Sequence, residues 1–232
     1  MTHAQTLYDA IKVGPATGGF TPGGLQTTDT RLIADDIHTA PGTAGSAITQ
    51  FSLSLADVSG SPSAFTTRAN VGFWLPDGVG GGPGSLLATS TFLFTLQPGG
   101  EGVFSTTLPD GLLTVPTGEV FWAGVSFTAA SGGGTPVVNG QLNGITLGLF
   151  DPPTTVGSTT RTFFETATGY APTTSNPAGD LSTGPNTRNF GWRFASGPAG
   201  PAVPEPSALA WLAASLPVGT WMLRKRRKHS DV

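Results

Sequence analysis

Residues 50–57 read Gln-Phe-Ser-Leu-Ser-Leu-Ala-Asp, and this alternation of apolar and small polar side chains decides the fold. Because successive side chains of an extended strand point to opposite faces, Phe51, Leu53 and Leu55 share one face. The two serines share the other face. Helical periodicity is almost absent from the chain before residue 203. We therefore predict a β-strand with one buried face at 50–57.

Short alternating runs of the same kind recur along the chain, separated by clusters of Gly, Pro, Ser, Thr and Asp. They predict further strands at 7–11, 31–37, 71–75, 86–96, 102–108, 112–115, 120–128, 145–150, 161–166 and 190–194. Trp74 and Trp122 stand on the opposite face from the other apolar residues of their strands. The stretch 14–24 is rich in glycine, and 168–188 is predicted to be a long loop. A strand roughly every ten residues predicts an all-β fold, an antiparallel β-sandwich of jelly-roll type.

Composition places the chain among globular proteins that are rich in turns. Its 232 residues include 34 glycines and 20 prolines, and only 11% are charged. Such a mixture is too apolar for a disordered chain and has too many turn residues for a helical one. No cysteine is present, which excludes disulfide bonds, thiol catalysis and cysteine-ligated metals. The stability of the fold must therefore come from a packed core.

Charge is distributed unevenly along the sequence. Residues 1–206 hold six Lys or Arg against thirteen Asp or Glu, a net charge of −7, whereas residues 207–232 hold five against one, a net charge of +4. Nucleic-acid binding needs a clustered basic face, which the acidic body lacks. We therefore predict no nucleic-acid partner, and we interpret the cations near the C-terminus as determinants of membrane orientation.

Residues 203–232 have three parts in a fixed order. Val203-Pro204-Glu205-Pro206 comes first, and its two prolines forbid helix and favour an extended backbone that another protein can read. Residues 207–223 follow without a charge and, as a helix, would span about 25 Å, slightly less than a hydrocarbon core of about 30 Å. The five cations at 224–228 would stay on the cytoplasmic side. This order predicts a single C-terminal hydrophobic helix in a membrane.

These residues resemble the PEP-CTERM protein-sorting signal. The residues that carry the resemblance are Val203, Pro204, Glu205, Pro206, Arg224, Lys225, Arg226, Arg227 and Lys228. The resemblance implies an exported bacterial protein whose tail is recognised and cleaved by a membrane transpeptidase of the exosortase class. It also implies an association with cell envelopes and exopolysaccharide. A simple tail anchor is the alternative, although Pro217 removes a backbone hydrogen bond within the apolar run, which suits a temporary span better than a permanent one.

The N-terminus poses a separate question, because residues 1–6 have neither a basic region nor an apolar core. A sorting signal at one end requires an export signal at the other. We expect that the natural reading frame begins upstream or that a leader was removed, and Ala4 before Gln5 suits cleavage after a small residue. Cytoplasmic residence is the alternative.

The sequence predicts three parts: a β-sandwich ectodomain at 1–195, a Gly/Pro linker at 196–202 and the sorting tail at 203–232. Segments of the first part also resemble the choice-of-anchor β-sandwich ectodomains that precede such tails. The matching segments are 33–37, 73–87 and 108–127. This resemblance implies fold and location, and it brings no catalytic residues.

Candidate catalytic and metal-binding residues are few. Among the three histidines, His38 alone lies away from the termini; with Asp36 and a serine it could form a nucleophilic arrangement, but no Gly-x-Ser-x-Gly turn is present. Asp35 and Asp36, with Asp9 or Asp29, could offer oxygen ligands to calcium, but no Asp-x-Asp-x-Asp-Gly loop is present. In a strand the two neighbouring carboxylates point to opposite faces, so we expect them to be solvated or bonded in turns. Nothing in the spacing selects a pair for glycoside hydrolysis, and we assign no catalytic residue, metal site or cofactor.

Three tryptophans and one glycine run offer binding hypotheses. Trp74, Trp122 and Trp192 would form a platform for sugar rings if exposed, whereas buried they would be packing residues. The glycine run 78–84 lacks the Lys-Ser/Thr ending of a phosphate-binding loop, and no helix pattern follows it. We therefore interpret it as a connection between strands.

Together these patterns predict a structural protein of a bacterial cell surface or extracellular matrix, exported and first held in the membrane by lipid contacts of residues 207–223. Its expected partners are an exosortase-type transpeptidase and exopolysaccharide. A surface-displayed carbohydrate-binding module is the alternative from another class. A hydrolase that acts on matrix polymers through His38 is a further alternative.

Overall fold

The computed structural model describes residues 4–12, 16, 18–21, 30–60, 62–130, 141–150, 156–160, 162–166, 179–180 and 189–197. The chain divides into two units, Met1–Ala199 and Gly200–Val232, and every described residue belongs to the first. The predicted sorting tail at 203–232 and its apolar run therefore lie outside the described residues. Among the residues that are described, no helix has the length and apolar character needed to cross a membrane.

The first sheet contains seven strands, and all its pairings are antiparallel. Its order is β1-β13-β4-β9-β12, with β2 beside β9 and β7 beside β4. The strands are β1 (Gln5–Asp9), β2 (Gly18–Phe20), β4 (Gln50–Asp57), β7 (Glu101–Thr107), β9 (Ile145–Phe150), β12 (Asn189–Phe190) and β13 (Trp192–Ser196). The strand β4, in which apolar and polar residues alternate, pairs with β13, β7 and β9 and lies at the centre of this sheet.

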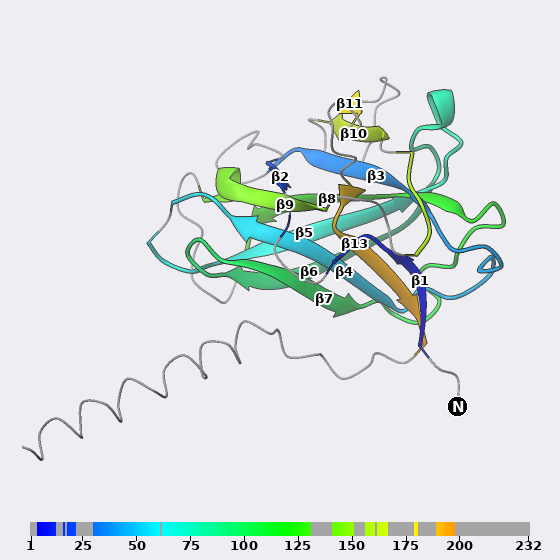
Figure 1. The fold of residues 1–232 in the computed structure, drawn as a ribbon, viewed down its shortest axis with the longest axis horizontal. Coiled ribbons are helices and arrows are strands. Elements are labelled where there is room, and N and C mark those ends of the chain that lie inside the picture. Colours follow the sequence, from blue (N-terminus) through cyan, green and yellow to red (C-terminus); the bar gives the residue numbers. More distant parts are fainter. Residues whose placement is uncertain are drawn as a thin grey trace, which may run out of the picture. The chain divides into compact units, whose positions relative to one another are not determined.

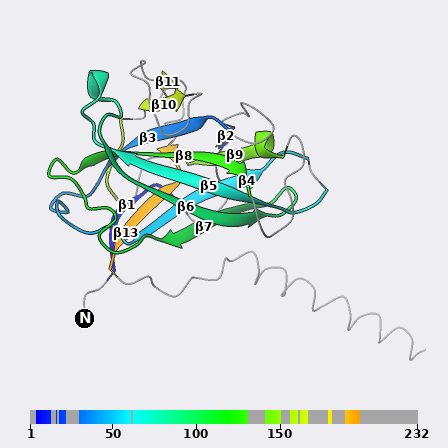
Figure 2. The same cartoon turned by 180° about the vertical axis from the view of Figure 1, so that it is seen from behind.

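The second sheet contains six strands in the order β11-β10-β3-β8-β5-β6, again all antiparallel. The strands are β3 (Leu32–His38), β5 (Phe65–Trp74), β6 (Leu86–Leu96), β8 (Val120–Ala129), β10 (Thr162–Thr166) and β11 (Gly179–Asp180). Its longest members, β8, β5 and β6, lie alongside one another in both views (Figures 1 and 2). Two 3-10 helices complete the described elements: η1 (Val79–Gly81) between β5 and β6, and η2 (Leu142–Gly144) before β9.

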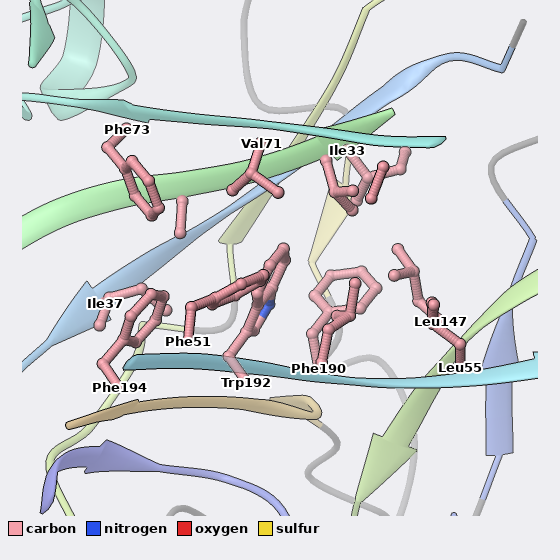
Figure 3. Close-up of a cluster of buried hydrophobic side chains, with 14 of the residues drawn as sticks. Ile33, Ile37, Phe51, Leu55, Val71, Phe73, Leu147, Phe190, Trp192 and Phe194 are labelled. Atoms are coloured by element: carbon pink, nitrogen blue, oxygen red, sulfur yellow. The ribbon is translucent and has the colours of Figure 1, made fainter. Parts of the chain in front are cut away.

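The two sheets pack face to face around an aromatic core (Figure 3). The ring centroid of Phe51 lies 5.3 Å from that of Phe194 and 5.4 Å from that of Trp192, all in the first sheet. Phe121 of the second sheet meets Phe194 edge to face at 5.2 Å and so joins the two layers. Burying one such side chain fully contributes about 1.5–3 kcal/mol. The predicted all-β architecture with two antiparallel sheets is therefore observed.

Most predicted strands are observed, and those at 50–57, 86–96 and 145–150 have the predicted bounds. The strand predicted at 112–115 is wrong. Thr114 makes an isolated bridge with Ala47, because this segment hydrogen-bonds to the residues just before β4 and no longer ladder forms.

Two further differences involve glycine. The strand β2 lies in the glycine-rich stretch, where no side-chain alternation exists to predict it. The predicted strand 190–194 is divided at Gly191, whose N–H donates to Gly148 and whose carbonyl accepts from Ser54, both at 2.9 Å. A Cβ atom at Gly191 would lie 2.6 Å from the Phe150 ring, so the division requires glycine. Of the loop predicted at 168–188, the described part is β11.

Candidate functional site

One side of the sandwich is closed by residues 156–160, which we call the strap. Val156 forms an antiparallel bridge with Asp9 of β1, and Ser158 forms one with His38 of β3. The backbone N–H of Ser158 donates to the His38 carbonyl, and that of His38 donates to the Ser158 carbonyl, both at 2.9 Å. Because β1 ends the first sheet and β3 belongs to the second, the strap joins the two sheets.

The strap bulges opposite Asp36. The chain pairs with β3 at Ser158, opposite His38, and again at Phe163, opposite Asp35. Between these two pairs the facing segment is four residues long in the sequence, whereas β3 has only Asp36 and Ile37. Such a bulge leaves backbone N–H groups without a ladder partner, and a side chain must satisfy them.

The Asp36 carboxylate accepts hydrogen bonds from donors of the bulged segment. It accepts the Thr160 N–H at 2.9 Å on Oδ2 and 3.2 Å on Oδ1, and the Thr159 hydroxyl donates to Oδ1 at 2.7 Å. Nε2 of His38 lies 2.8 Å from Oδ2. Burial alone would raise the pKa of Asp36, but the hydrogen bonds from His38, Thr159 and Thr160 outweigh it and lower that pKa. Asp36 is thus an ionised anchor that holds the strap to β3.

Its neighbour Asp35 faces the interior of the sandwich, on the side of β3 that carries Ile33 and Ile37. Oδ1 accepts a 3.3 Å hydrogen bond from the Thr159 hydroxyl, and Oδ2 has no partner among the described residues. Burial, and then the charge of Asp36, raise the pKa of Asp35 well above its usual value. The pKa values of the two adjacent carboxyls are therefore shifted in opposite directions, and Asp36 is the stronger acid.

Tyr8 of β1 and Gly157 of the strap also pack on the side of the sandwich that the strap closes. The Tyr8 hydroxyl is fully buried and has no partner in the described part of the chain. Burial raises its pKa well above the usual value, and the charges of Asp35, Asp36 and Asp9 add to the effect, so the ring lies within their electrostatic reach. Gly157 has φ of 77°, and a Cβ there would lie 2.3 Å from the His38 carbonyl oxygen and 2.9 Å from the Tyr8 ring.

The sequence prediction for the carboxylates is wrong in one respect. Asp35 and Asp36 are not solvated, since they are 0% and 3% exposed. They leave β3 on opposite faces as predicted, yet Thr159 contacts both because the strap folds over the edge of the strand. Among the other calcium candidates, Asp9 pairs with Arg193 at 2.9 Å and Asp29 lies outside the described residues. Within the described part, no three His, Asp or Glu side chains are grouped to hold a metal ion.

A shallow depression of about 320 Å³ adjoins the strap. It is lined by His38, Thr39, Pro41, Gly118, Glu119, Val120, Gly157 and Ser158. Glu119 has φ of 58°, a left-handed conformation that no other non-glycine residue of the described chain adopts. Its carboxylate accepts the backbone N–H groups of Gly42 at 2.6 Å, Thr43 at 2.9 Å and Ala44 at 3.3 Å. These three bonds offset the backbone strain at Glu119.

His38 and Asp36 form a carboxylate–imidazole pair, an arrangement that catalytic triads also contain. The imidazole is 33% exposed and borders the depression. Among the described residues, however, no serine or threonine hydroxyl hydrogen-bonds to the ring, and its partner is the Asp36 carboxylate. The arrangement that the structure shows is therefore a structural pair that stabilises the strap, without an assembled nucleophile in the described region.

Trp74 and Trp122 are packing residues, the second of the two roles that the sequence left open, and they form no sugar platform. Both lie on the outer face of the second sheet, as predicted, but they are 1% and 3% exposed. Gly72 and Gly124 make room for the Trp74 ring, since a Cβ would lie 2.4 Å and 3.0 Å from its atoms. The Trp122 Nε1–H donates to the Gly81 carbonyl at 2.9 Å, so the glycine loop caps the ring.

Trp192 and the glycine loop have structural roles. Trp192 is 0% exposed and belongs to the core of Figure 3. The glycine run connects β5 to β6 as predicted, and its backbone donors are used within the loop. Gly84 N–H donates to Leu75 O at 2.9 Å and Gly78 N–H to Gly82 O at 3.0 Å. These donors are therefore not available to a phosphate group.

Thr159, Thr160, Glu119 and Tyr8 were not predicted as members of this region. The Thr159–Asp36 contact spans 123 positions of sequence, and no local pattern marks it. Glu119 ends a turn in which its N–H donates to the Pro116 carbonyl at 2.8 Å. The residues of this turn give no sign of what the Glu119 carboxylate binds.

Comparison with known proteins adds no further constraint: no protein-family model matches this chain, and no curated protein matches it.

Proposed function

We propose that this chain is an exported structural protein that its C-terminal Pro-Glu-Pro signal delivers to a bacterial cell surface or extracellular matrix. One observation carries the proposal: the motif Pro204-Glu205-Pro206, an uncharged run at 207–223 and a cationic block at 224–228 follow one another in that order in the sequence. No function of soluble β-sandwiches requires this order of segments, whereas a signal that is recognised at a membrane requires it.

The described sandwich supports a passive role for the body. Its largest apolar side chains are buried, including all three tryptophans that could have bound a flat ligand. Its strongest polar cluster, around Asp36, makes hydrogen bonds that close the fold. Chemically useful groups are thus committed to holding the two sheets together, as a scaffold requires.

The delivery mechanism follows from the tail. Residues 207–223 form a hydrophobic helix that holds the precursor in the bilayer, with Arg224–Lys228 on the cytoplasmic side. An exosortase-type transpeptidase reads Pro204-Glu205-Pro206 and cuts the chain near it, and the jelly-roll body is released or anchored again outside. Exopolysaccharide of the envelope is the proposed neighbour of the delivered body.

Mass spectrometry of the protein recovered from its native host tests this proposal. The mature chain is expected to end near Pro206, without the apolar run, and to be found in the envelope or medium. A Glu205→Gln variant is expected to keep its tail and stay in the membrane, whereas Glu101→Gln, a matched change outside the signal, is processed normally. An intact Val232 in the cytosolic fraction would contradict the proposal.

Carbohydrate binding is the second candidate, and one observation favours it over an enzyme. The depression beside the strap offers His38, Glu119 and Ser158, side chains of the kind that hydrogen-bond to sugar hydroxyls. A glycan array probed with the wild type and with His38→Ala tests this role. If His38→Ala abolishes glycan binding and Trp74→Phe preserves it, the result would favour a carbohydrate-binding module. If the wild type binds no glycan on the array, the result would favour the structural role.

A further inference from the structure

The exposed apolar side chains of the described residues gather on one strand. Large hydrophobic residues are exposed at Val58, Val79, Leu86, Leu87 and Leu93. Three of these five belong to β6, with 53%, 37% and 49% of their surfaces exposed. Isolated exposed leucines need no explanation, but a cluster along one strand marks an interaction surface.

This strand is also the end of its sheet. Among the described strands β6 pairs with β5 alone, along almost its whole length, and its other side carries backbone groups without a ladder partner (Figures 1 and 2). Such an edge is a template for pairing with another strand. Natural proteins normally protect long edges with charges or proline. Residues 86–96, Leu-Leu-Ala-Thr-Ser-Thr-Phe-Leu-Phe-Thr-Leu, contain neither.

A β-bulge opposite Trp74 is the one irregularity of this edge. It lies at the start of the strand, where Trp74 pairs with Leu86 and Phe73 pairs with Ala88. Because of the bulge, Leu86 and Leu87 are both exposed. The β5–β6 ladder is regular from Ala88 to Leu96. The protection that a bulge gives an edge is therefore confined to its end.

The outward side chains of β6 from Leu87 to Leu93 read the same in both directions. Ala88 and Phe94 face the core, so the outward positions are 87, 89, 91, 93 and 95, which hold Leu, Thr, Thr, Leu and Thr. The first four of these form a palindrome centred on Ser90, and Thr95 lies beyond it. A strand with such symmetry is complementary to an antiparallel copy of itself, because a two-fold axis through Ser90 places leucine beside leucine and threonine beside threonine.

We propose that the partner of this edge is a second copy of the same chain, paired antiparallel along β6 about a two-fold axis at Ser90. Leu87 then lies beside Leu93 of the partner subunit, and Thr89 beside Thr91 of the partner subunit. The backbone groups of both edges become paired, and the second sheets of the two copies become one continuous sheet. No charged side chain of residues 86–96 opposes this approach.

The absence of cysteine from the chain makes the register directly testable. A Ser90→Cys variant carries a single thiol on the proposed axis, where opposed residues of an antiparallel pair lie about 4.5–5.5 Å apart between Cα atoms, within the range of a disulfide. Mild oxidation of the full chain in detergent is expected to give a covalent dimer. In Thr95→Cys the two thiols would stand roughly 30 Å apart along the paired strands, so this matched variant is expected to stay monomeric.

Charge substitution gives an independent test that does not depend on cross-linking. The double change Thr89→Lys with Thr91→Lys places like charges opposite each other twice and is expected to weaken dimerisation about tenfold in sedimentation equilibrium. The double change Thr89→Glu with Thr91→Lys places opposite charges there and is expected to restore it. Val58→Lys, on an exposed apolar residue away from β6, is expected to change nothing.

Circular dichroism and thermal melting must show that each variant is folded. Equal cross-linking of Ser90→Cys and Thr95→Cys would overturn the proposed register. A dimer that persists in the Lys/Lys variant, or a wild type that is monomeric at every concentration tested, would overturn the proposal itself.

Discussion

The two sides of the sandwich close in opposite ways. On one side the strap at 156–160 bridges β1 and β3, and its backbone donors end on a buried carboxylate. On the other side β6 ends the second sheet with an uncharged strand that exposes Leu86, Leu87 and Leu93 together with its threonines. The backbone N–H and C=O groups at a sheet edge need hydrogen-bond partners. The strap provides such partners for β1 within the chain, whereas the edge of β6 remains available to another strand.

The difference teaches where polar groups contribute in a sandwich of this kind. At the strap, a desolvated charge is stabilised because several donors converge on it, so removing it leaves those donors unpaired. Along β6, the outward side chains remain in water and contribute little to the folded monomer. Damage to the first side should therefore unfold the protein, whereas changes on the second should alter association.

The largest effect is expected from Asp36→Ala. Removing the carboxylate takes away both acceptor atoms of the Thr160 N–H and the shorter hydrogen bond of the Thr159 hydroxyl, which should cost about 3 kcal/mol of the free energy of unfolding. Urea denaturation measures it. Thr91→Ala on the open side is the control and should change stability by less than about 0.5 kcal/mol. Equal losses for the two variants would erase the contrast between the sides.

A smaller loss is expected from Gly157→Ala. Alanine there must adopt φ of 77°, and its Cβ would lie 2.3 Å from the His38 carbonyl oxygen, so the strap must move. We expect a loss of about 2 kcal/mol in thermal or urea unfolding. Gly45→Ala is the matched control, because Gly45 has φ of 79° with nothing near its Cβ position. Its loss of about 1 kcal/mol isolates the backbone strain, and identical losses would show that the strap tolerates displacement.

The smallest effect concerns the pH dependence that Asp35 confers. Its pKa is raised in the folded state, so the unfolded chain releases this proton first as the pH rises above the usual value of 3.8. The contribution of Asp35 to stability therefore falls with rising pH until the folded pKa is passed. The lowered pKa of Asp36 acts in the opposite sense, since its contribution is present above 3.8 and is lost as the pH falls through the folded value.

Asp35→Asn removes the first of these two effects. Between pH 4.5 and pH 7 the unfolding free energy of the variant should rise relative to that of the wild type, because position 35 then has no carboxyl to ionise on unfolding. Urea titrations at the two pH values measure the difference. Parallel pH profiles for the two proteins would show that Asp35 is not held neutral in the fold.

Much of the fold could be predicted because each strand carries its own pattern. The alternation of apolar and polar residues in β4 and β6 predicted the bounds of both strands. The two-residue period of a strand placed Trp74 and Trp122 on the outer face. The failures fall where side chains do not set the structure. β2 consists of Gly-Gly-Phe, and residues 112–115 alternate but meet the residues before β4 rather than a strand.

The candidate site was predictable only in its members on β3. Asp35, Asp36 and His38 stand close together in the sequence and were singled out there. Their burial was not predicted, because the groups that bury and bond them, Thr159 and Thr160, lie on the strap. Likewise, the burial of Trp122 could not be predicted, because the Gly81 carbonyl that accepts its indole N–H comes from a segment 41 positions away in the sequence.

The sequence by itself determined the all-β class of the body, the lack of disulfide and thiol chemistry, and the tripartite order of the tail, because each of these depends on composition or on neighbours along the chain. Only the tertiary structure decided that the paired carboxylates are a buried anchor, that the tryptophans are covered, and that β6 ends its sheet. The physical reason is that burial and sheet order depend on which distant segments meet, and the solvation of a charge or an edge changes when they do.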